Sequence, residues 1–452
     1  MAATPPTRDR YVDFLRAASI TLVVLGHWLI SVVLVTNGHV TATNALATVP
    51  WLRVLTWVFQ VMPVFFFVGG FSNQLAVDHQ RTHGRGYGDY LRRRTDRLLR
   101  PTIVFALVWL VVARLFEALS LDRSLVHTVA KLAAQPLWFL AVYLVVVALA
   151  PPMLAFGRRN TVAPFVVLSI AVITIDVVRF HWGEVDLATV NYGLVFLFAQ
   201  QLGFLYADGW LTRLPVGRLA AVSATALGLL VLLTTVGTYP VSMVGVPGEA
   251  ISNMSPPTVC ILVLTIAQVA LVMALRGPAS RWLQARGPWT VTVAVNARIM
   301  TLFLWHLTAI VAAGGLLLAV GLPTPAAGAA GWWALRIVWI ASSAIVLAGL
   351  ILLFGRFETS GEPPTGETVR RATAWISVVG LALAVRGLIG LALTGFARVL
   401  VSPRRSFMWM RPSPALDVAL IVVGYLLVVG LPTRRRPPVG PSGSDRRSLG
   451  SG

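Results

Sequence analysis

The sequence has few charged residues and almost no cysteine. Only 12% of its 452 residues are Asp, Glu, Lys or Arg, whereas soluble domains carry roughly 25%. The one cysteine, Cys260, lies within an apolar run, so it can form neither an intramolecular disulfide nor a cysteine-based metal site. We expect no metal. The scarcity of charge excludes an ordinary water-soluble domain.

Long apolar runs are abundant instead. Hydrophobic residues make up 57% of the chain, and runs of about 20 residues, long enough to cross the hydrocarbon of a bilayer, recur along its whole length. The first run is too long for the apolar part of a cleavable signal and should remain as a helix. We predict helices at residues 14–36, 51–72, 98–118, 136–156, 162–181, 187–207, 217–237, 256–275, 290–320, 332–354, 373–396 and 414–431.

The predicted fold is therefore an all-α polytopic membrane protein with three parts. Residues 1–355 form a ten-helix membrane domain, and residues 356–431 form an extension with one or two further membrane segments. The basic tail at 432–452 is too polar to bury a core and should be disordered.

The net charge of +20 is divided among short arginine clusters between the apolar runs. These clusters precede the first helix and follow the even-numbered helices through the tenth, while the opposite loops hold few basic residues. This asymmetry places the N-terminus in the cytoplasm of a multi-pass protein of the plasma membrane. The clusters form no continuous basic face, so the lipid bilayer is an expected partner and nucleic acid is not.

The first predicted helix carries three ionisable residues at helical spacings. Arg16 and His27 are eleven positions apart, about three full turns, so both lie on one stripe about 16 Å apart along the axis. Asp13 stands three residues before Arg16, a spacing at which side chains can pair. Ionisable groups inside a membrane helix are costly unless they face the bundle interior or a wet cavity. We expect Arg16 and His27 to open onto the same cavity.

These residue types suit a transfer reaction. Arginine offers a planar fork for phosphate or carboxylate, and neutral histidine can take up or pass on a proton near neutral pH. The alternative for His27 is a buried histidine that only hydrogen-bonds a neighbouring helix. The arginine in phase with it favours the functional interpretation.

A second arginine cluster lies in the predicted loop before the third helix. It includes Arg93, Arg94, Arg97 and Arg100. It fits a topology anchor against anionic headgroups, and it also fits a phosphate site for a nucleotide-like acyl carrier. Both interpretations can hold together.

Four more polar or aromatic residues are candidates for a substrate pocket. His306 lies in the ninth predicted helix at a depth comparable to that of His27. It fits a group that hydrogen-bonds the substrate or a neighbouring helix better than it fits a second catalytic histidine. Asn296 lies nearer the cytoplasmic end of the same helix, and Gln201 fits an interhelical hydrogen bond. Trp138 fits an interfacial anchor or a pocket wall.

The motif around the first helix resembles that of a known family. Asp13-Phe-Leu-Arg16-Ala, followed by Gly26-His27, is similar to helix 1 of the membrane enzymes called acyltransferase family 3. The family's Arg-x-x-Arg feature is matched by Arg94-Thr-Asp-Arg97, with an overlapping copy at Arg97-Leu-Leu-Arg100. Further similar segments are Met62 to Phe71, Pro136 to Leu140, Asn191 to Gly209 and Leu304 to Leu307, of which the last two resemble an actinobacterial branch.

The resemblance spans about residues 8–355 and implies a function. It implies transfer of an acyl group, typically acetyl from acetyl-CoA, to a hydroxyl of a cell-envelope glycan, a lipid or a small glycoside. Carried over, Arg16 would orient the donor, with Asp13 beside it, and His27 would be the general base or a transient acyl acceptor. Arg94 and Arg97, with Arg93 and Arg100 as neighbouring candidates, would hold the phosphates of CoA.

This chain departs from the family pattern in two places. Gly69 stands where the family often has a serine, and two hydrophobic segments follow the ten-helix core. Two other functions remain open from the residues alone. A secondary transporter should show two related halves, which the sequence does not display, and a scaffold without chemistry leaves the phase of Arg16 and His27 unexplained.

Overall fold

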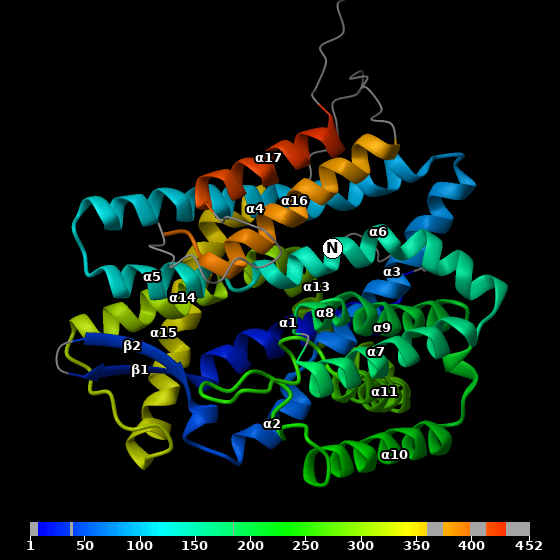
Figure 1. Ribbon diagram of the computed structural model, residues 1–452, viewed down its shortest axis with the longest axis horizontal. Helices are drawn as coiled ribbons and strands as arrows, with labels where there is room; N and C mark the ends of the chain where they lie inside the picture. Colours follow the sequence, from blue (N-terminus) through cyan, green and yellow to red (C-terminus); the bar gives the residue numbers. More distant parts are fainter. Residues whose placement is uncertain (1–7, 37–38, 184, 359–373, 398–412, 431–452) are drawn as a thin grey trace, which may run out of the picture.

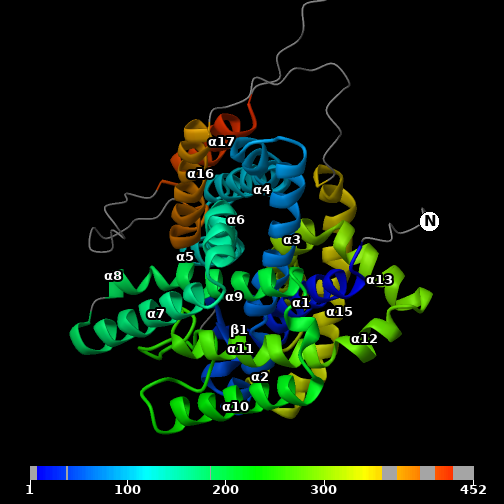
Figure 2. The same ribbon diagram turned by 90° about the vertical axis from the view of Figure 1, so that its right-hand side faces the viewer.

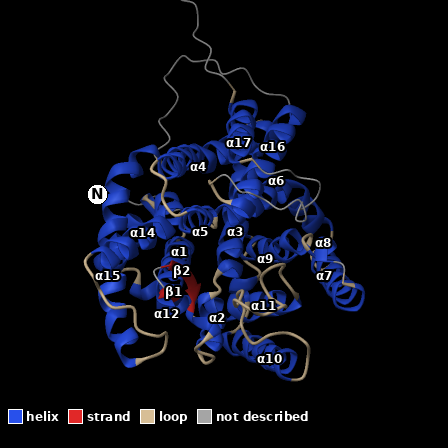
Figure 3. Ribbon diagram, turned by 60° about the vertical axis from the view of Figure 1, so that its left-hand side comes forward, coloured by secondary structure: helices blue, strands red, loops and turns tan. Residues whose placement is uncertain are grey.

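The computed structural model describes residues 8–36, 39–183, 185–358, 374–397 and 413–430. This part of the chain is a bundle of helices (Figure 1), and its one sheet is a two-stranded hairpin (Figure 3). Ten of its helical segments are long and apolar enough to span a membrane, and a pair bent by 52° would make an eleventh. The predicted all-α polytopic membrane fold is confirmed. The predicted disordered tail at 432–452 lies outside the described residues.

Each of the twelve predicted segments coincides with at least one helix, although several bounds differ. The helices of the first half are α1 (Arg10–Ile30), α2 (Leu52–Phe59), α3 (Met62–Thr82), α4 (Tyr87–Ala118), α5 (Arg123–Ala134), α6 (Leu137–Arg159), α7 (Ala163–Trp182), α8 (Val185–Ala188) and α9 (Asn191–Ala207). Those of the second half are α10 (Val216–Thr235), α11 (Val259–Ala274), α12 (Arg276–Trp282), α13 (Arg286–Ala297), α14 (Ile299–Ala319), α15 (Ala330–Phe354), α16 (Ala374–Thr394) and α17 (Pro414–Val429).

The first helix ends earlier than predicted. It stops at Ile30, and the next residues form strand β1 (Ser31–Thr36), which pairs antiparallel with β2 (His39–Asn44). The predicted continuation of the helix to residue 36 is therefore wrong. The valines and threonine of β1 are β-branched and favour a strand, and the Ser31 hydroxyl donates to the His27 carbonyl at the helix end, at 2.6 Å.

The arginine-rich segment before the third predicted helix is itself helical, so its prediction as a loop is wrong. It forms the first turns of α4, which begins at Tyr87 and continues through Pro101. Leu91, Leu98 and Leu99 are buried at helical spacing, which gives this stretch an apolar stripe with the arginines around it. The arginines are therefore held on one rigid element.

The ninth predicted helix is divided in two. α13 and α14 meet at Arg298, whose backbone (φ −131°, ψ 24°) is not helical. Glu358 caps the N-terminus of α14, because its carboxylate accepts from the backbone N–H groups of Met300 and Thr301 at 2.9 and 3.1 Å. A carboxylate suits these N–H groups because the first turn of a helix leaves them unpaired.

Helices α3 and α9 pack unusually closely. A Cβ added at Gly203 would lie 2.1 Å from the backbone oxygen of Phe67, and one added at Gly70 would lie 2.2 Å from that of Gln200. Glycine therefore permits this contact, as small residues do in membrane helix pairs. Next to it, the Asn73 side chain donates to the Gln200 side chain at 2.9 Å. Because α3 also packs against α1, this close contact holds α3 rigidly beside α1.

Helices α16 and α17 pack against each other and against α4, at the edge of the molecule opposite α10 (Figures 1 and 2). Arg386 of α16 donates to Asp417 of α17 at 2.7 Å, and Asp417 is fully buried. Tyr425 of α17 donates to Asp96 of α4 at 2.7 Å. The ion pair accounts for an arginine inside an apolar helix, because a buried charge needs a partner.

The two ends of the bundle differ in structure. The N-terminal end holds the start of α1, where Asp9 accepts from Tyr206 at 2.6 Å, and Tyr206 in turn accepts from Arg276 at 3.0 Å. The hairpin end holds β1, β2, α2 and the loop at 236–258. That loop is attached to α2, because Trp57 donates to the Val241 carbonyl at 2.7 Å.

Candidate active site

Arg16 and Asp13 form an ion-paired group near the N-terminal end of α1. Arg16 Nη1 lies 3.5 Å from Asp13, and the other carboxylate oxygen of Asp13 accepts from Arg8. A second amino group of Arg16 donates to the Ser72 hydroxyl on α3. Asp13 thus holds Arg16 from one side and α3 holds it from the other, which fixes the direction of the guanidinium.

The arginines of α4 divide between two faces of that helix. Arg94 donates to the backbone carbonyl of Ser72, the residue whose hydroxyl binds Arg16. Arg94 and Arg97 lie within electrostatic reach of Arg16, whereas Arg100 lies within reach of Tyr425 on α17. Arg93 is exposed. Of the two overlapping Arg-x-x-Arg copies, Arg94 and Arg97 are therefore the pair nearer α1.

These arginines leave positive charge available for a ligand. The Nε group of Arg94 is buried and has no hydrogen-bond partner. Within the described ranges, neither Arg94 nor Arg97 forms an ion pair with a carboxylate. Guanidinium groups in this state suit phosphate, which is recognised by planar, two-pronged hydrogen bonding. We call Arg16, Arg94 and Arg97 the arginine cluster.

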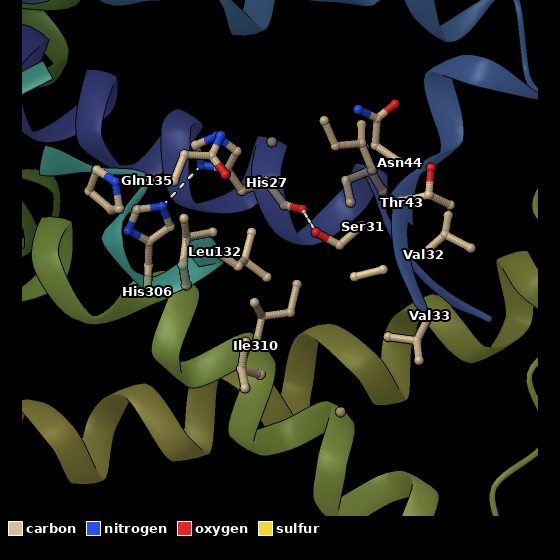
Figure 4. A pocket seen from close by; sticks show the side chains of 18 of the residues that line it. His27, Ser31, Val32, Val33, Thr43, Asn44, Leu132, Gln135, His306 and Ile310 are labelled. Carbon is tan, nitrogen blue, oxygen red and sulfur yellow. Dashed lines mark hydrogen bonds between the residues drawn. The ribbon is translucent and has the colours of Figure 1, made fainter. Parts of the chain in front are cut away.

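His27 and His306 form a direct pair in the interior of the bundle. Nδ1 of His27 lies 3.0 Å from Nε2 of His306, and the two rings are stacked with centroids 5.1 Å apart (Figure 4). His306 is fully buried, and its Nδ1 lies 2.6 Å from the backbone oxygen of Phe303. Trp28, next to His27, donates to the His306 backbone oxygen at 2.9 Å. The two helices are thus fixed against each other at this point.

The hydrogen-bond partners of the two rings determine which ring nitrogens carry a proton. A carbonyl oxygen only accepts hydrogen bonds, so Nδ1 of His306 carries the proton that faces Phe303. In neutral His306, Nε2 is then an acceptor, and Nδ1–H of His27 donates to it. Nε2 of His27 is left with a free lone pair, which is the state that a general base or a nucleophile needs.

His27 and His306 line a large cavity at the hairpin end. Its volume is about 1140 Å³, and its walls come from α1, α2, α5, α6, α14, the hairpin and the loop at 236–258. Figure 4 shows His27 and His306 on one side, with Leu132, Gln135 and Ile310 near them and Thr43 and Asn44 of the hairpin farther away. The cavity is mostly apolar, with a few polar groups, as ligand sites commonly are.

Arg16 is not among the residues that line this cavity, which differs from the expectation that it shares one with His27. Aromatic rings lie between the two. Phe139 lines the cavity, and Tyr143, one helical turn further along α6, stacks on Phe139 at 5.9 Å and lies within electrostatic reach of Arg16. Phe65 and Phe66 pack edgewise or tilted on Tyr143, each at 5.7 Å. We call these four rings the aromatic layer.

The other predicted pocket residues are placed as follows. Trp138 lines the cavity and packs on Tyr192 at 5.5 Å. Asn296 lies elsewhere, where it donates to the Asp13 backbone oxygen at 2.8 Å. Gln201 also lies elsewhere and donates to the Met153 backbone oxygen at 3.0 Å, which joins α9 to α6.

Two residues at this site had not been singled out from the sequence. Ser72 joins Arg16 to Arg94, and Tyr143 connects the arginine cluster with the aromatic layer. Ser72 directly follows the Met62 to Phe71 segment, and Tyr143 lies one helical turn after Phe139 of the Pro136 to Leu140 segment. Their position next to these family-like segments is the sequence feature that points to them.

Comparisons with known proteins address the family directly. A family model described as an acyltransferase domain, that of acyltransferase family 3, matches residues 9–355, which is more than half of the chain and ends where α15 ends. No curated protein and no solved structure matches the chain. Among the described residues, no three His, Cys, Asp or Glu side chains gather as a metal site. The chain belongs to acyltransferase family 3 and is a membrane acyltransferase.

Proposed function

We propose that this enzyme moves an acyl group, typically acetyl, from acyl-CoA to a hydroxyl of a cell-envelope glycan, a lipid or a small glycoside. The observation that carries the proposal is the His27–His306 pair, which lines a cavity of about 1140 Å³ in a chain of an acyltransferase family. The family match also favours acyl transfer over a transporter. The protein would lie in the plasma membrane with its N-terminus in the cytoplasm.

The donor would bind at the N-terminal end. The arginine cluster offers guanidinium groups that no carboxylate among the described residues neutralises, apart from the single contact of Arg16 with Asp13. CoA carries phosphates, and charge-assisted hydrogen bonds from arginine are among the stronger polar contacts that proteins make. Asp13 would act as a positioning residue because it touches Arg16 and Arg8. Arg93 and Arg100, at the rim of the cluster, would contribute mainly long-range attraction.

The acceptor would bind in the large cavity at the hairpin end. Its entry from that end places the hydroxyl beside His27, while the donor approaches from the opposite end. The thioester must then pass the aromatic layer, so we expect Phe139 and Tyr143 to line the path of the acyl group. Trp138 and His306 are wall residues of the same cavity.

The reaction needs one base and one path for the proton. Nε2 of His27 takes the proton of the acceptor hydroxyl while the hydroxyl oxygen bonds to the acyl carbon. The carbon–sulfur bond of the thioester breaks, and the leaving thiolate takes the proton from Nε2 of His27, so that His27 returns to its neutral state. His306 holds Nδ1 of His27 and stabilises the imidazolium that forms, as the third group of a hydrolase triad does for its histidine.

His27 has a second available role. Its Nε2 can attack the acyl carbon first and carry the acyl group until the hydroxyl takes it. Rapid mixing of the purified enzyme with acyl-CoA, without acceptor, separates the two roles. A burst of free CoA equal to the enzyme concentration indicates an acyl-histidine intermediate, and its absence indicates a general base.

Mass spectrometry of envelope glycans and lipids tests the proposed activity in cells. A deletion strain should lack the mass of one acyl group on one glycan or lipid, and the parental gene should restore it. A gene with His27→Ala should not restore it, although the variant protein is present in the membrane. Full restoration by His27→Ala would overturn the proposal.

A further inference from the structure

Arg336 of α15 is a buried positive charge without a counter-charge. It is 9% exposed, and its Nη1 group donates to the backbone oxygen of Ser31 at 2.7 Å. Its Nε group is buried without a partner. In the part of the chain that the structure describes, no carboxylate lies within ion-pair distance of it. Such a charge is costly inside a membrane protein, and the catalytic proposal does not use it.

Two tryptophans on the same face of α15 add further unpaired donors. The guanidinium lies 4.3 Å from the ring of Trp332 and 5.0 Å from that of Trp339. These residues are four before and three after Arg336, the spacings of side-chain neighbours on a helix. The indole N–H groups of both are buried without an acceptor, although a buried tryptophan N–H usually has one. Three donors thus gather with no acceptor to receive them.

A small pocket lies against these side chains. Its volume is about 40 Å³, and Trp332, Arg336 and Trp339 line it. It adjoins the large cavity, because Val33, Gly314, Leu318 and Trp339 line both.

Gly314 leaves room for the ring of Trp339, which lines both the pocket and the cavity. A Cβ at this position would lie 2.9 Å from the Trp339 ring, so the glycine allows that ring its place. The volume of about 40 Å³ equals roughly three water molecules. That space suits a group of about three heavy atoms, such as a carboxylate.

We propose that this pocket binds an oxyanion group carried by the acceptor, so that the acceptor of the reaction is an acidic molecule. Among the side chains that line the pocket, Trp332, Arg336 and Trp339 contribute donors and one positive charge, Thr324 contributes a hydroxyl, and the others are apolar. An oxyanion is the group that receives such hydrogen bonds and also neutralises the charge. The continuity with the large cavity places this anion on the molecule whose hydroxyl lies beside His27. This assignment rests on the proposed function, whereas the anion site itself does not.

The test is binding of fluoroacetate to the full-length protein in phosphatidylcholine nanodiscs, followed by ¹⁹F NMR without any acyl donor. Fluoroacetate should bind the parent protein, and 2-fluoroethanol, a neutral molecule of similar size, should not. Arg336→Gln, whose amide can still donate to the Ser31 carbonyl, should weaken fluoroacetate binding about tenfold or more. Trp339→Phe, which removes one N–H and keeps a ring, should weaken it severalfold.

Two variants at the hairpin end serve as matched controls. Trp333→Phe changes the neighbouring tryptophan, which stacks on Trp51 at 5.7 Å, and Arg53→Gln removes an arginine that pairs with Glu249 at 2.9 Å. Both should bind fluoroacetate as the parent does. Equal binding by the parent, Arg336→Gln and Trp339→Phe would overturn the anion site.

The source of the anion is tested separately. Monofluorophosphate in place of fluoroacetate reports whether the pocket prefers a phosphate, and nanodiscs with added phosphatidylglycerol report whether a lipid headgroup fills it. Unchanged fluoroacetate binding in these nanodiscs supports an acidic acceptor, whereas displacement assigns the site to lipid and overturns the acceptor assignment. Because no acyl-CoA is present, a failure here is distinct from a loss of acyl transfer, which release of CoA measures independently.

Discussion

His27 and His306 are 279 positions apart in the chain and touch in the fold. The backbone oxygen of Phe303 fixes the proton of His306, and His306 in turn fixes the proton of His27. In the proposed mechanism, this chain of hydrogen bonds sets which nitrogen of His27 can react. We therefore propose that His306 is a positioning residue whose ring acts through His27.

We predict graded losses of activity for two substitutions of His306. In His306→Ala, the ring of His27 loses its partner and kcat should fall by up to about 10⁴-fold, the loss seen when the group that orients the histidine of a hydrolase triad is changed. In His306→Gln, the side-chain oxygen can still accept from His27, so kcat should lie between those of the alanine variant and the parent. Steady-state kinetics in nanodiscs measures both. Equal losses in the two variants would mean that His306 serves packing alone.

The arginine cluster leads to a prediction about the donor. Arg94→Gln should raise the KM for acyl-CoA about tenfold and change kcat little, because it removes a phosphate contact made before and during the reaction alike. Arg100→Gln is the matched control, since Arg100 lies toward Tyr425 rather than Arg16. Its KM should stay within about twofold of the parent. A larger rise in KM in Arg100→Gln than in Arg94→Gln would contradict this assignment and would place the donor site on the other face of α4.

At the residue scale, contacts between residues of one helix could be predicted from their spacing in the sequence, whereas contacts between different helices could not. The spacing of Asp13 and Arg16 predicted their pairing, which the structure shows at 3.5 Å. The contact of Arg16 with Ser72 depends on how α1 lies against α3, and spacing within α1 holds no information about that. For the same reason, the position of the aromatic layer between Arg16 and the cavity could not be predicted, since its rings come from α3 and α6.

Among the elements, hydropathy located the helices but not their breaks. The run from Ser31 to Thr36 is as apolar as a helix end, yet its β-branched residues pair with a second strand. The break at Arg298 depends on Glu358, a residue distant in the sequence whose carboxylate caps α14. The early start of α4 was missed because arginine signals a loop in a hydropathy profile although it favours a helix.

The closeness of α3 and α9 predicts a marked loss of stability in Gly203→Ala. The added methyl group would meet the Phe67 carbonyl, and crowding of this kind costs about 1–3 kcal/mol. Gly193→Ala, on the same helix and with no atom within 4 Å of the added Cβ, is the control. Thermal unfolding followed by size-exclusion chromatography should show a lower midpoint for Gly203→Ala only. Equal midpoints would mean that the helices can separate without cost.

At the scale of the whole molecule, the proposed donor and acceptor sites require that the two ends of the bundle face opposite sides of the membrane. The arginine cluster and Arg276 lie at the N-terminal end with the start of α1, and the large cavity lies at the hairpin end. Acyl-CoA is a cytoplasmic donor, so the orientation decides whether the acceptor comes from outside. The positive charge of the loops predicts the N-terminal end inside.

Cysteine labelling tests this orientation, because the natural Cys260 is fully buried and can be replaced by alanine. Thr161→Cys lies in the exposed turn between α6 and α7, and Thr238→Cys lies in the exposed loop after α10. A membrane-impermeant maleimide should label Thr238→Cys in intact cells and Thr161→Cys only after permeabilisation. The opposite pattern would place the arginine cluster outside and contradict the donor site.

Release of CoA by purified His27→Ala protein in nanodiscs tests catalysis at His27 without any contribution from the cell. His181→Ala, which alters an exposed histidine on α7, is the control. With acetyl-CoA as donor and an acidic envelope glycan as acceptor, we predict a loss of about 10²- to 10⁴-fold in His27→Ala, the usual contribution of a general base, and the parental rate in His181→Ala. The parental rate in His27→Ala would contradict catalysis at this histidine.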